Sequence, residues 1–364
     1  MTEKILIGER WIGDGCPTYI IAEIGSNHDG SLEKAKELVE ASRDAGADAV
    51  KFQSFTAEGL LNPLRPADDG SWEPNPAYGV LESLSLPAQW HYELKRFCDA
   101  VGIDFLSAPF DDGRADLLNS IGVPAFKIAS GDITNTPLLR RVASFGKPVI
   151  ISTGASYLKE VDEAVKTVME EGNRNIALLH CVSLYPAAFE EVNIRSMVTI
   201  KKACGLPVGF SDHTRGALLP VAAVAMGASI IEKHITLSRS LDGPDHHYAM
   251  EVDEFKAMVT DIRNLEKAMG NGLKRPAERE MGERIGARRS IYLREDVKRG
   301  TVLTASMLKI VRHCHGMEPS ELDNVIGTVA QKDLRKDMPL RADDICKVSE
   351  WNGLGEEELT YAGG

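Results

Sequence analysis

The sequence predicts a closed barrel of eight parallel strands and eight helices, a (β/α)8 or TIM barrel, followed by a small β-rich domain. Short apolar runs alternate strictly with helical patterns between Thr18 and Met269, and this alternation is typical of parallel strands. Eight such units fit within about 250 residues, the usual size of a (β/α)8 barrel. After Met269 the alternation ends and short turns dominate, which indicates a second domain of a different kind.

The predicted strands are the short apolar runs, and the predicted helices are the segments between them. The strands comprise residues 19–24, 49–53, 104–108, 125–128, 149–152, 176–180, 208–210 and 229–234. The helices comprise residues 32–44, 87–101, 113–121, 137–145, 158–171, 194–203, 217–226 and 253–269. An open, doubly wound sheet is the alternative. It fits less well, because no Gly-x-Gly-x-x-Gly motif follows the first strand.

The domain boundaries follow from composition. We expect a short lead-in over residues 1–16 within a catalytic domain of residues 1–270. A polar linker spans 271–285, the β-rich domain spans 286–349, and the acidic tail 350–364 is expected to be disordered. The second domain contains a weak repeat at an offset of 37, in which residues 296–308 match residues 333–345, so we expect a duplicated motif.

Residues 60–80 interrupt the second strand–helix unit and are rich in Pro, Gly and Asp. We expect a long loop at the catalytic end of the barrel. It is either a lid or a surface insertion with no role.

The net charge argues against some partners, and the cysteines indicate the compartment. A net charge of −12 argues against nucleic acid and anionic membranes, although a local cationic pocket can still bind an anionic substrate. The apolar runs are shorter than the about 20 residues that cross a bilayer, and the N-terminus lacks a signal-peptide core. The six cysteines are scattered, so we expect reduced thiols and a cytoplasmic protein.

Every predicted strand ends in a polar residue or is followed by one. In a barrel of this class the chemistry takes place at the C-terminal ends of the strands. The polar residues there are Glu23, Lys51, Gln53, Ser107, Lys127, Ser130, Ser152, His180, Ser183, Tyr185, Ser211, His213, Glu232 and His234. Burying such a set without partners would cost about 1–3 kcal/mol for each group, which favours a ligand site.

The residue types divide by chemistry. Two lysines and four hydroxyls suit a phosphate and a carboxylate held together, because lysines act as point charges and hydroxyls as neutral donors; they are Lys51, Lys127, Ser130, Ser152, Ser183 and Ser211. His213 and His234 end successive strands and suit a divalent cation with open positions. Glu23 and Glu232 are the candidates for proton transfer. This combination suggests chemistry on phosphoenolpyruvate.

Several motifs resemble the sialic acid synthase family, which condenses phosphoenolpyruvate with an N-acetylated amino-sugar aldehyde. They lie in order along the barrel with spacing similar to the family's: residues 21–30, 46–53, 126–131, 151–154, 179–186, 208–214, 232–236 and 243–246. The C-terminal segment resembles the family's antifreeze-like (SAF) domain, so the resemblance covers about residues 17 to 348.

The resemblance implies roles for the matching residues. His213 and His234 would hold a divalent metal, usually Mn2+, with Mg2+ or Co2+ as alternatives. The six lysines and serines would bind phosphoenolpyruvate, and Glu23 would lie at the reacting centre. Tyr185 and Asp245 would bind the sugar, and we add Gln53 to these candidates.

The resemblance also implies a homodimer in which the SAF domain closes the partner's site, with Arg312 reaching the sugar's N-acetyl group. Two departures concern the sugar. Ser183 stands where N-acetylneuraminate synthases have Asn, and is more usual among synthases of other nonulosonic acids. The Arg312 loop reads Arg-His-Cys-His-Gly instead of Arg-Pro-Gly-x-Gly.

The predicted function is therefore a nonulosonic acid synthase that joins phosphoenolpyruvate, an amino-sugar aldehyde and water into a nine-carbon ketoacid, releasing phosphate by C–O cleavage. The acceptor is N-acetylmannosamine or a 2,4-diacetamido-trideoxyhexose. The alternatives are a related synthase acting on a phosphorylated aldose, and a catalytically inactive sugar-binding barrel.

The remaining histidines are expected to have other roles. We expect His28 to orient the first loop or to reach the rim without being a ligand, and His91, in a surface helix, to be structural. His246 and His247 either touch substrate or are solvated.

Overall fold

The computed structural model describes residues 4–352. The chain divides into two compact units between Asn271 and Gly272, next to the predicted boundary, and each unit is described separately below. Residues 353–364, most of the predicted tail, lie outside the described residues.

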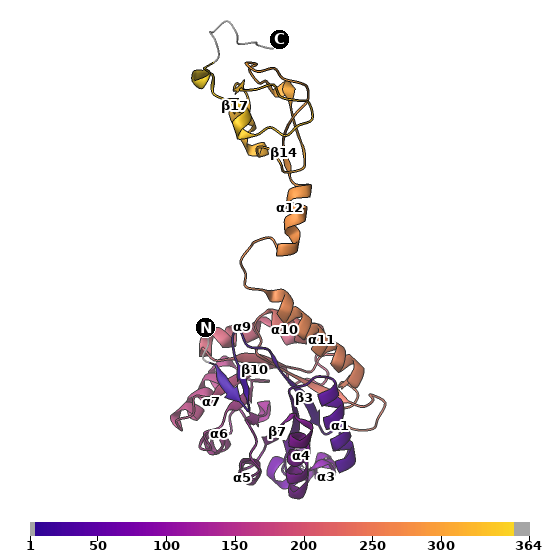
Figure 1. The fold of residues 1–364 in the computed structure, drawn as a ribbon. Coiled ribbons are helices and arrows are strands. Elements are labelled where there is room, and N and C mark those ends of the chain that lie inside the picture. Colours follow the sequence, from indigo (N-terminus) through magenta and orange to yellow (C-terminus); the bar gives the residue numbers. More distant parts are fainter. Residues whose placement is uncertain (1–3, 353–364) are drawn as a thin grey trace. The chain divides into compact units, whose positions relative to one another are not determined.

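The first unit is a nearly closed barrel of eight parallel strands, as predicted (Figure 1). The strands are β3 (Tyr19–Gly25), β4 (Ala49–Ser54), β7 (Asp104–Pro109), β8 (Phe126–Ile128), β9 (Val149–Ser152), β10 (Ile176–Cys181), β11 (Val208–Asp212) and β12 (Ile230–Thr236). They pair in the order β7-β4-β3-β12-β11-β10-β9-β8, and the end strands β7 and β8 lie beside each other. Since β3 pairs with β12, the first and last strands meet, which excludes the open doubly wound sheet.

Helices surround the strands and follow the predicted segments within two residues. The principal ones are α1 (Leu32–Asp44), α4 (Ala88–Val101), α5 (Asp112–Ser120), α6 (Thr136–Ala143), α7 (Leu158–Glu170), α9 (Arg195–Cys204), α10 (Leu218–Ala225) and α11 (Val252–Met269). Local sequence fixes several starts: the side chains of Ser31, Asp111 and Asn135 accept hydrogen bonds from backbone N–H groups in the first turns of α1, α5 and α6.

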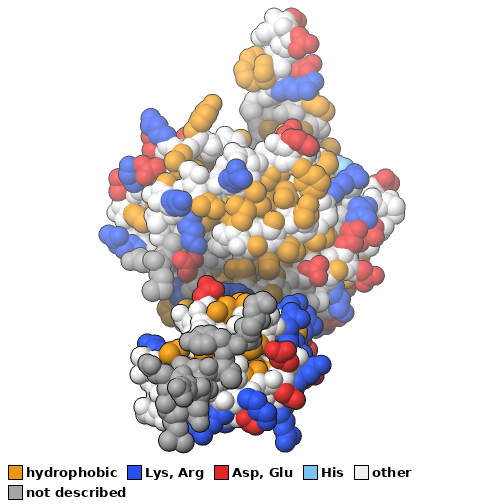
Figure 2. Space-filling model, turned by 90° about the horizontal axis from the view of Figure 1, so that it is seen from above, with side chains coloured by type: hydrophobic (Ala, Val, Ile, Leu, Met, Phe, Trp, Pro, Cys, Tyr) orange, Lys and Arg blue, Asp and Glu red, His pale blue; other side chains and the backbone are white. Residues whose placement is uncertain are grey.

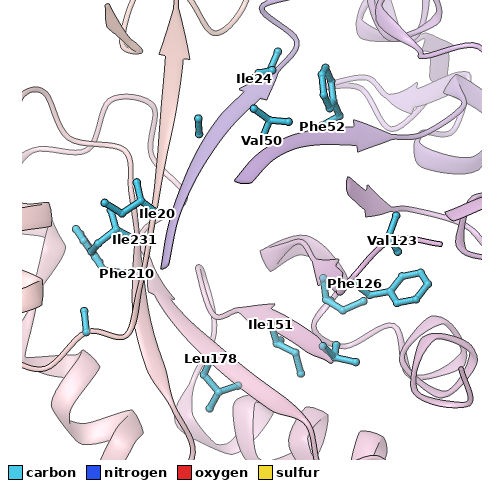
Figure 3. Packing of buried hydrophobic residues seen from close by; sticks show 14 of the residues in the cluster. Ile20, Ile24, Val50, Phe52, Val123, Phe126, Ile151, Leu178, Phe210 and Ile231 are labelled. Atoms are coloured by element: carbon cyan, nitrogen blue, oxygen red, sulfur yellow. The ribbon is translucent and has the colours of Figure 1, made fainter. Parts of the chain in front are cut away.

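Each strand carries one face toward the helices and one toward the barrel axis, because successive side chains alternate. Figure 3 shows residues of the outer face, among them Phe52, Phe126 and Phe210, in the core between strands and helices. The lower part of the inner face is a separate apolar cluster. Its members are Ile5, Ile7, Ile12, Tyr19, Ile21, Ala49, Leu106, Ala125, Ile150, Ala177, Leu179 and Ile230.

Two predicted loops are structured. The lead-in contains a hairpin of β1 (Ile5–Ile7) and β2 (Arg10–Ile12), whose isoleucines join the inner cluster and seal the N-terminal end of the barrel. The interruption at 60–80 is not an irregular loop: α2 (Ala57–Leu60), a hairpin of β5 (Leu64–Pro66) and β6 (Trp72–Pro74), and α3 (Pro76–Leu84) occupy it. An Arg65–Glu73 ion pair joins the two hairpin strands.

The second unit is a small β-rich fold with its own core. Its elements are η2 (Glu278–Glu280), α12 (Met281–Ala287), β14 (Arg289–Leu293), η3 (Ala305–Met307), β15 (Leu308–Arg312), η4 (Pro319–Glu321), α13 (Leu322–Val325), β16 (Val329–Ala330), η5 (Ala342–Asp344), β17 (Ile345–Cys346) and η6 (Val348–Glu350). The predicted linker, residues 271–285, contains η2 and most of α12.

The repeat at offset 37 corresponds to an internal two-fold relation. Val297 and Leu334, which occupy the same position in the two copies, exchange both backbone hydrogen bonds, at 2.9 and 2.7 Å. The bridge Tyr292–Pro339 is matched by the bridge Val329–Val302, each residue being shifted by 37. The two copies therefore form one core together.

The surface mixes charges of both signs. On the face drawn in Figure 2, basic and acidic side chains lie intermingled around an area of hydrophobic ones. Within residues 4–352, no helix is long and apolar enough to cross a membrane.

Candidate active site

The predicted polar residues form a layer directly above the inner apolar cluster. Side chains two positions apart in a strand share a face. The apolar residues Ile21, Ala49, Ala125, Ile150 and Ile230 are followed two positions later by Glu23, Lys51, Lys127, Ser152 and Glu232. All five residues are at most 5% exposed. The strand period thus brings residues from five strands to one level of the barrel.

Opposite charges alternate within this layer. Lys51 Nζ lies 2.7 Å from Glu23 Oε2 and 3.8 Å from Glu232 Oε1. Lys127 Nζ lies 3.7 Å from the same oxygen of Glu232 and donates to Ser152 Oγ at 2.6 Å. Ser211 Oγ donates to Glu232 Oε1 at 3.0 Å. Glu232 therefore bridges the two lysines.

The two carboxyl groups have different protonation properties. Burial raises the pKa of Glu23 to about 7, an effect that Lys51 only partly offsets. Burial also acts to raise the pKa of Glu232, but Lys127 and Lys51 outweigh it and lower this pKa to about 2. Near neutral pH, Glu23 is poised to exchange a proton, whereas Glu232 stays ionised.

The serines after β8 and β10 converge on Gly154. Its N–H donates to Ser130 Oγ at 2.9 Å. A Cβ placed on Gly154 would lie 2.3 Å from Ser183 Oγ and 2.7 Å from Ser130 Oγ. A glycine is required here, and its absent side chain lets two hydroxyls and a backbone N–H gather beside Ser152, a donor set that suits phosphate oxygens.

His213 and His234 lie above the charged layer, as the prediction from strands β11 and β12 requires. Their ring centroids are 5.4 Å apart. His213 Nδ1 lies 2.7 Å from Val182 O, so this nitrogen carries the proton and Nε2 keeps its lone pair. Burial lowers the pKa of each ring to about 4, so both are neutral at pH 7.

Two neutral imidazoles fit a divalent cation whose other positions are filled by substrate and water. Across residues 4–352, no group of three or more His, Cys, Asp and Glu side chains converges as a metal site.

The sugar candidates surround the two histidines. The Tyr185 ring lies 4.2 Å from that of His213 and is half-exposed. Asp245 Oδ2 lies 3.8 Å from His234 Nδ1 and accepts from the Ser26 N–H at 3.3 Å. Gln53 instead donates to Glu23 Oε1 at 3.1 Å, which ties it to the proton-exchanging carboxyl group. These positions form the mouth of the site.

Two polar residues predicted at the rim face away from it. Ser107 Oγ bonds to Ser54 Oγ at 2.6 Å, which in turn bonds to His91 Nε2 at 2.7 Å, on the helix side of the barrel wall. His180 Nε2 lies 2.7 Å from Val192 O, also outside the wall. The physical reason is the strand period: each lies one position from an inward-facing residue. His91 is structural but fully buried rather than on the surface.

Sequence reasoning missed Cys181 and Tyr248 near the site and left the role of His246 open. Cys181 is 5% exposed and its Sγ lies 3.8 Å from His213 Nδ1; its place two residues after the inward-facing Leu179 was the available signal. Tyr248 OH lies 3.4 Å from His234 Nδ1. His246 is buried rather than solvated. The last two lie in a loop whose path no periodicity predicts.

Arg312 lies in the other unit, exposed at the end of β15. The loop that follows Arg312 is held by two side chains of β14: Ser290 Oγ and Tyr292 OH donate to His313 O at 2.8 and 2.9 Å. This places Arg312 at the edge of a well-anchored turn.

Comparisons with known proteins identify both units. The NeuB family model matches residues 38–274, and the SAF domain model matches residues 288–345. The chain is 43% identical to N,N'-diacetyllegionaminic acid synthase of Legionella pneumophila, over 87% of this chain and 91% of that protein. It is 36% identical to pseudaminic acid synthase of Campylobacter jejuni, over 87% and 93%. The structure of N-acetylneuraminic acid synthetase from Leptospira borgpetersenii, in complex with citrate, covers 78% of this chain and 95% of that chain at 34% identity, with a TM-score of 0.71.

Proposed function

The chain belongs to the NeuB family, and we propose that it condenses phosphoenolpyruvate with an N-acetylated amino-sugar aldehyde and water to give a nonulosonic acid and phosphate. The observation that carries the proposal is the buried layer in which Lys51 and Lys127 flank Glu232 beneath two neutral histidines. Two cations below and two neutral imidazoles above suit an anionic enol ester bound beneath an aldehyde in one barrel.

The chain's residues divide the binding of phosphoenolpyruvate. Lys51 and Lys127 offset the charge of its carboxylate and phosphate. The hydroxyls of Ser130, Ser152, Ser183 and Ser211 supply neutral donors around them. When phosphoenolpyruvate binds, Lys51 and Lys127 pair with it instead of with Glu232. Among the described residues no group donates to Glu232 Oε2, so that oxygen faces the site with an open acceptor position.

The reaction forms one carbon–carbon bond and, from water, one carbon–oxygen bond, and it breaks the carbon–oxygen bond to phosphate. The two protons of the water end on the new hydroxyl group and on the released phosphate. C3 of phosphoenolpyruvate attacks the aldehyde carbon, whose oxygen takes up a proton to become a hydroxyl group. Water adds to the cationic C2, and the tetrahedral adduct loses phosphate by cleavage of its C2–O bond, leaving the ketone. Glu23, with its pKa near 7, accepts the proton of the water.

A divalent cation, Mn2+ by preference and Mg2+ or Co2+ as alternatives, would be held by His213 and His234 and would supply Lewis-acid polarisation of the aldehyde. Tyr185 and Asp245 would orient the sugar beside it. We further propose that the protein is cytoplasmic, and that it works as a homodimer in which Arg312 of one subunit contacts the sugar's acyl group in the other's site.

Phosphate release from phosphoenolpyruvate with a panel of amino-sugar aldehydes tests the function. The panel contains N-acetylmannosamine, its 6-phosphate and 2,4-diacetamido-trideoxyhexoses. We expect turnover with at least one unphosphorylated acceptor, and 18O from labelled water in the ketoacid. Label in the released phosphate would contradict C–O cleavage.

The phosphorylated-aldose alternative requires cations for a second phosphate. Three lysines are buried among the described residues, namely Lys51, Lys127 and Lys233. Lys233 pairs with Asp212 at 2.6 Å on the helix side. The two inward-facing lysines, Lys51 and Lys127, are needed for the phosphate and carboxylate of phosphoenolpyruvate, so no buried lysine among the described residues is left for a second phosphate. Turnover with the phosphorylated sugar alone would favour this alternative.

A further inference from the structure

We propose that His246 and Asp29 form a latch that fastens the loop after β12 onto the loop after β3 and thereby positions Asp245 for the acceptor sugar. The proposal rests on the proposed function, because it assigns a role within that reaction's acceptor site. His246 is a positioning residue here, since it acts through its neighbour.

Both ring nitrogens of His246 are used to hold the loop. Nε2 lies 2.9 Å from Asp29 Oδ1, and Nδ1 lies 2.7 Å from Oγ1 of Thr236, the last residue of β12. The ring is 1% exposed. One imidazole thus joins the end of strand β12 to the loop between β3 and α1.

The surrounding backbone is shaped to this contact. A Cβ on Gly243 would lie 2.7 Å from His246 Cδ2 and 3.0 Å from Asp29 Oδ1, so the loop approaches this closely only with glycine there. Asp29 has a left-handed φ of 49° and is also held by Lys34 Nζ at 2.7 Å. The carboxylate is therefore fixed from α1 as well.

The latch has a consequence at the mouth of the site. Asp245, the adjacent residue, turns the other way: its Oδ2 lies 3.3 Å from the Ser26 N–H and 3.8 Å from His234 Nδ1. Tyr248, two residues beyond His246, reaches His234 at 3.4 Å. Releasing His246 frees both side chains without touching the lysines and serines below.

Steady-state kinetics with each substrate varied in turn tests the latch. His246→Asn keeps a group near Thr236 but loses the contact with Asp29, and we expect the KM for the amino sugar to rise about tenfold or more while the KM for phosphoenolpyruvate stays within about twofold. In His246→Gln the longer amide reaches Asp29, and most of the wild-type acceptor KM should return.

Asp29→Gly removes the carboxylate from the other side, and glycine tolerates the left-handed φ, so it provides the test if His246→Asn does not fold. It should reproduce the acceptor defect. Lys36→Met, on the same helix but paired with Glu33 and Glu93 instead of Asp29, is the matched control and should match the wild type.

An unchanged acceptor KM in His246→Asn or Asp29→Gly, or an equal rise of both KM values, would overturn the latch. If the wild type turns over no acceptor, the proposed function fails instead. Amide hydrogen exchange over residues 237–249 then decides about the latch separately: faster exchange in His246→Asn than in the wild type supports it, and equal exchange rejects it.

Discussion

The two faces of the barrel strands both bury polar side chains, but they satisfy them differently. On the helix side the groups are matched within the chain: Lys233 with Asp212 at 2.6 Å, Ser107 with Ser54, and His180 with a backbone carbonyl. On the axis side Glu23 has a pKa raised to about 7, and one oxygen of Glu232 has no donor among residues 4–352.

The difference shows that burial of a polar group alone does not identify a functional residue. A buried charge that is fully paired contributes to the fold. A buried charge with open hydrogen-bonding capacity is arranged for a ligand that completes it.

Replacing one buried lysine on each face, Lys127 toward the axis and Lys233 toward the helices, tests this comparison most directly. We expect Lys127→Met to lower kcat/KM for phosphoenolpyruvate by about 10²- to 10³-fold, with little loss of stability because Lys51 still faces Glu232 at 3.8 Å. Lys233→Met leaves the buried Asp212 carboxylate without its counter-charge, which should lower the free energy of unfolding by about 3–5 kcal/mol. Phosphate-release kinetics and denaturant unfolding of both variants measure these effects. A stable but inactive Lys233→Met would show that the outer face takes part in the reaction.

Two glycines near Ser130, Gly154 and Gly131, test the predicted phosphate-binding end of the site. Gly154→Ala forces a Cβ to within 2.3 Å of Ser183 Oγ, and we expect kcat/KM for phosphoenolpyruvate to fall by about 10- to 10²-fold. Gly131→Ala, in the turn that holds Ser130, is the control because its Cβ meets nothing within 4 Å. Kinetics with phosphoenolpyruvate varied should separate them, and equal behaviour of the two variants would argue against the serine cradle.

The pH dependence distinguishes the two inner carboxyl groups. The pKa of Glu23 is raised to about 7, so this group is protonated below and ionised above that pH. If it accepts a proton from water, kcat/KM for phosphoenolpyruvate, which reports the free enzyme, should fall about tenfold per pH unit below pH 7 and stay level above it. Glu232, with its pKa lowered to about 2, remains ionised across this range. Phosphoenolpyruvate binding measured by calorimetry at each pH separates binding from chemistry, and a flat kcat/KM between pH 5 and 7 would exclude Glu23 as the base.

The strands and helices of the barrel were predictable because the spacing of apolar residues and the length of each segment indicated the same elements. The charged layer was equally accessible, since Lys51 and Lys127 lie two residues beyond Ala49 and Ala125 in short, buried strands. Ser107 and His180 were misplaced because a strand end does not reveal which of two adjacent residues faces the axis. Counting in twos from Leu106 and Leu179 corrects both.

The loops escaped prediction for a different reason. His246 and Tyr248 owe their positions to contacts with Asp29 and His234, which lie more than 200 and 14 residues away respectively in the chain. No local pattern encodes such contacts. The internal two-fold of the second unit was visible in the sequence, because its two copies keep the same core positions at a fixed offset.

The hairpin of β1 and β2 gives the barrel a floor. Since Ile5, Ile7 and Ile12 close the N-terminal end, molecules enter and leave through one opening. The lysine and serine layer lies nearest the floor, and the histidines and Asp245 lie above it. For the proposed reaction we therefore expect phosphoenolpyruvate to bind before the sugar, and phosphate to leave after the nine-carbon acid. The substrate that binds first, phosphoenolpyruvate, thus gives rise to the product that leaves last, phosphate.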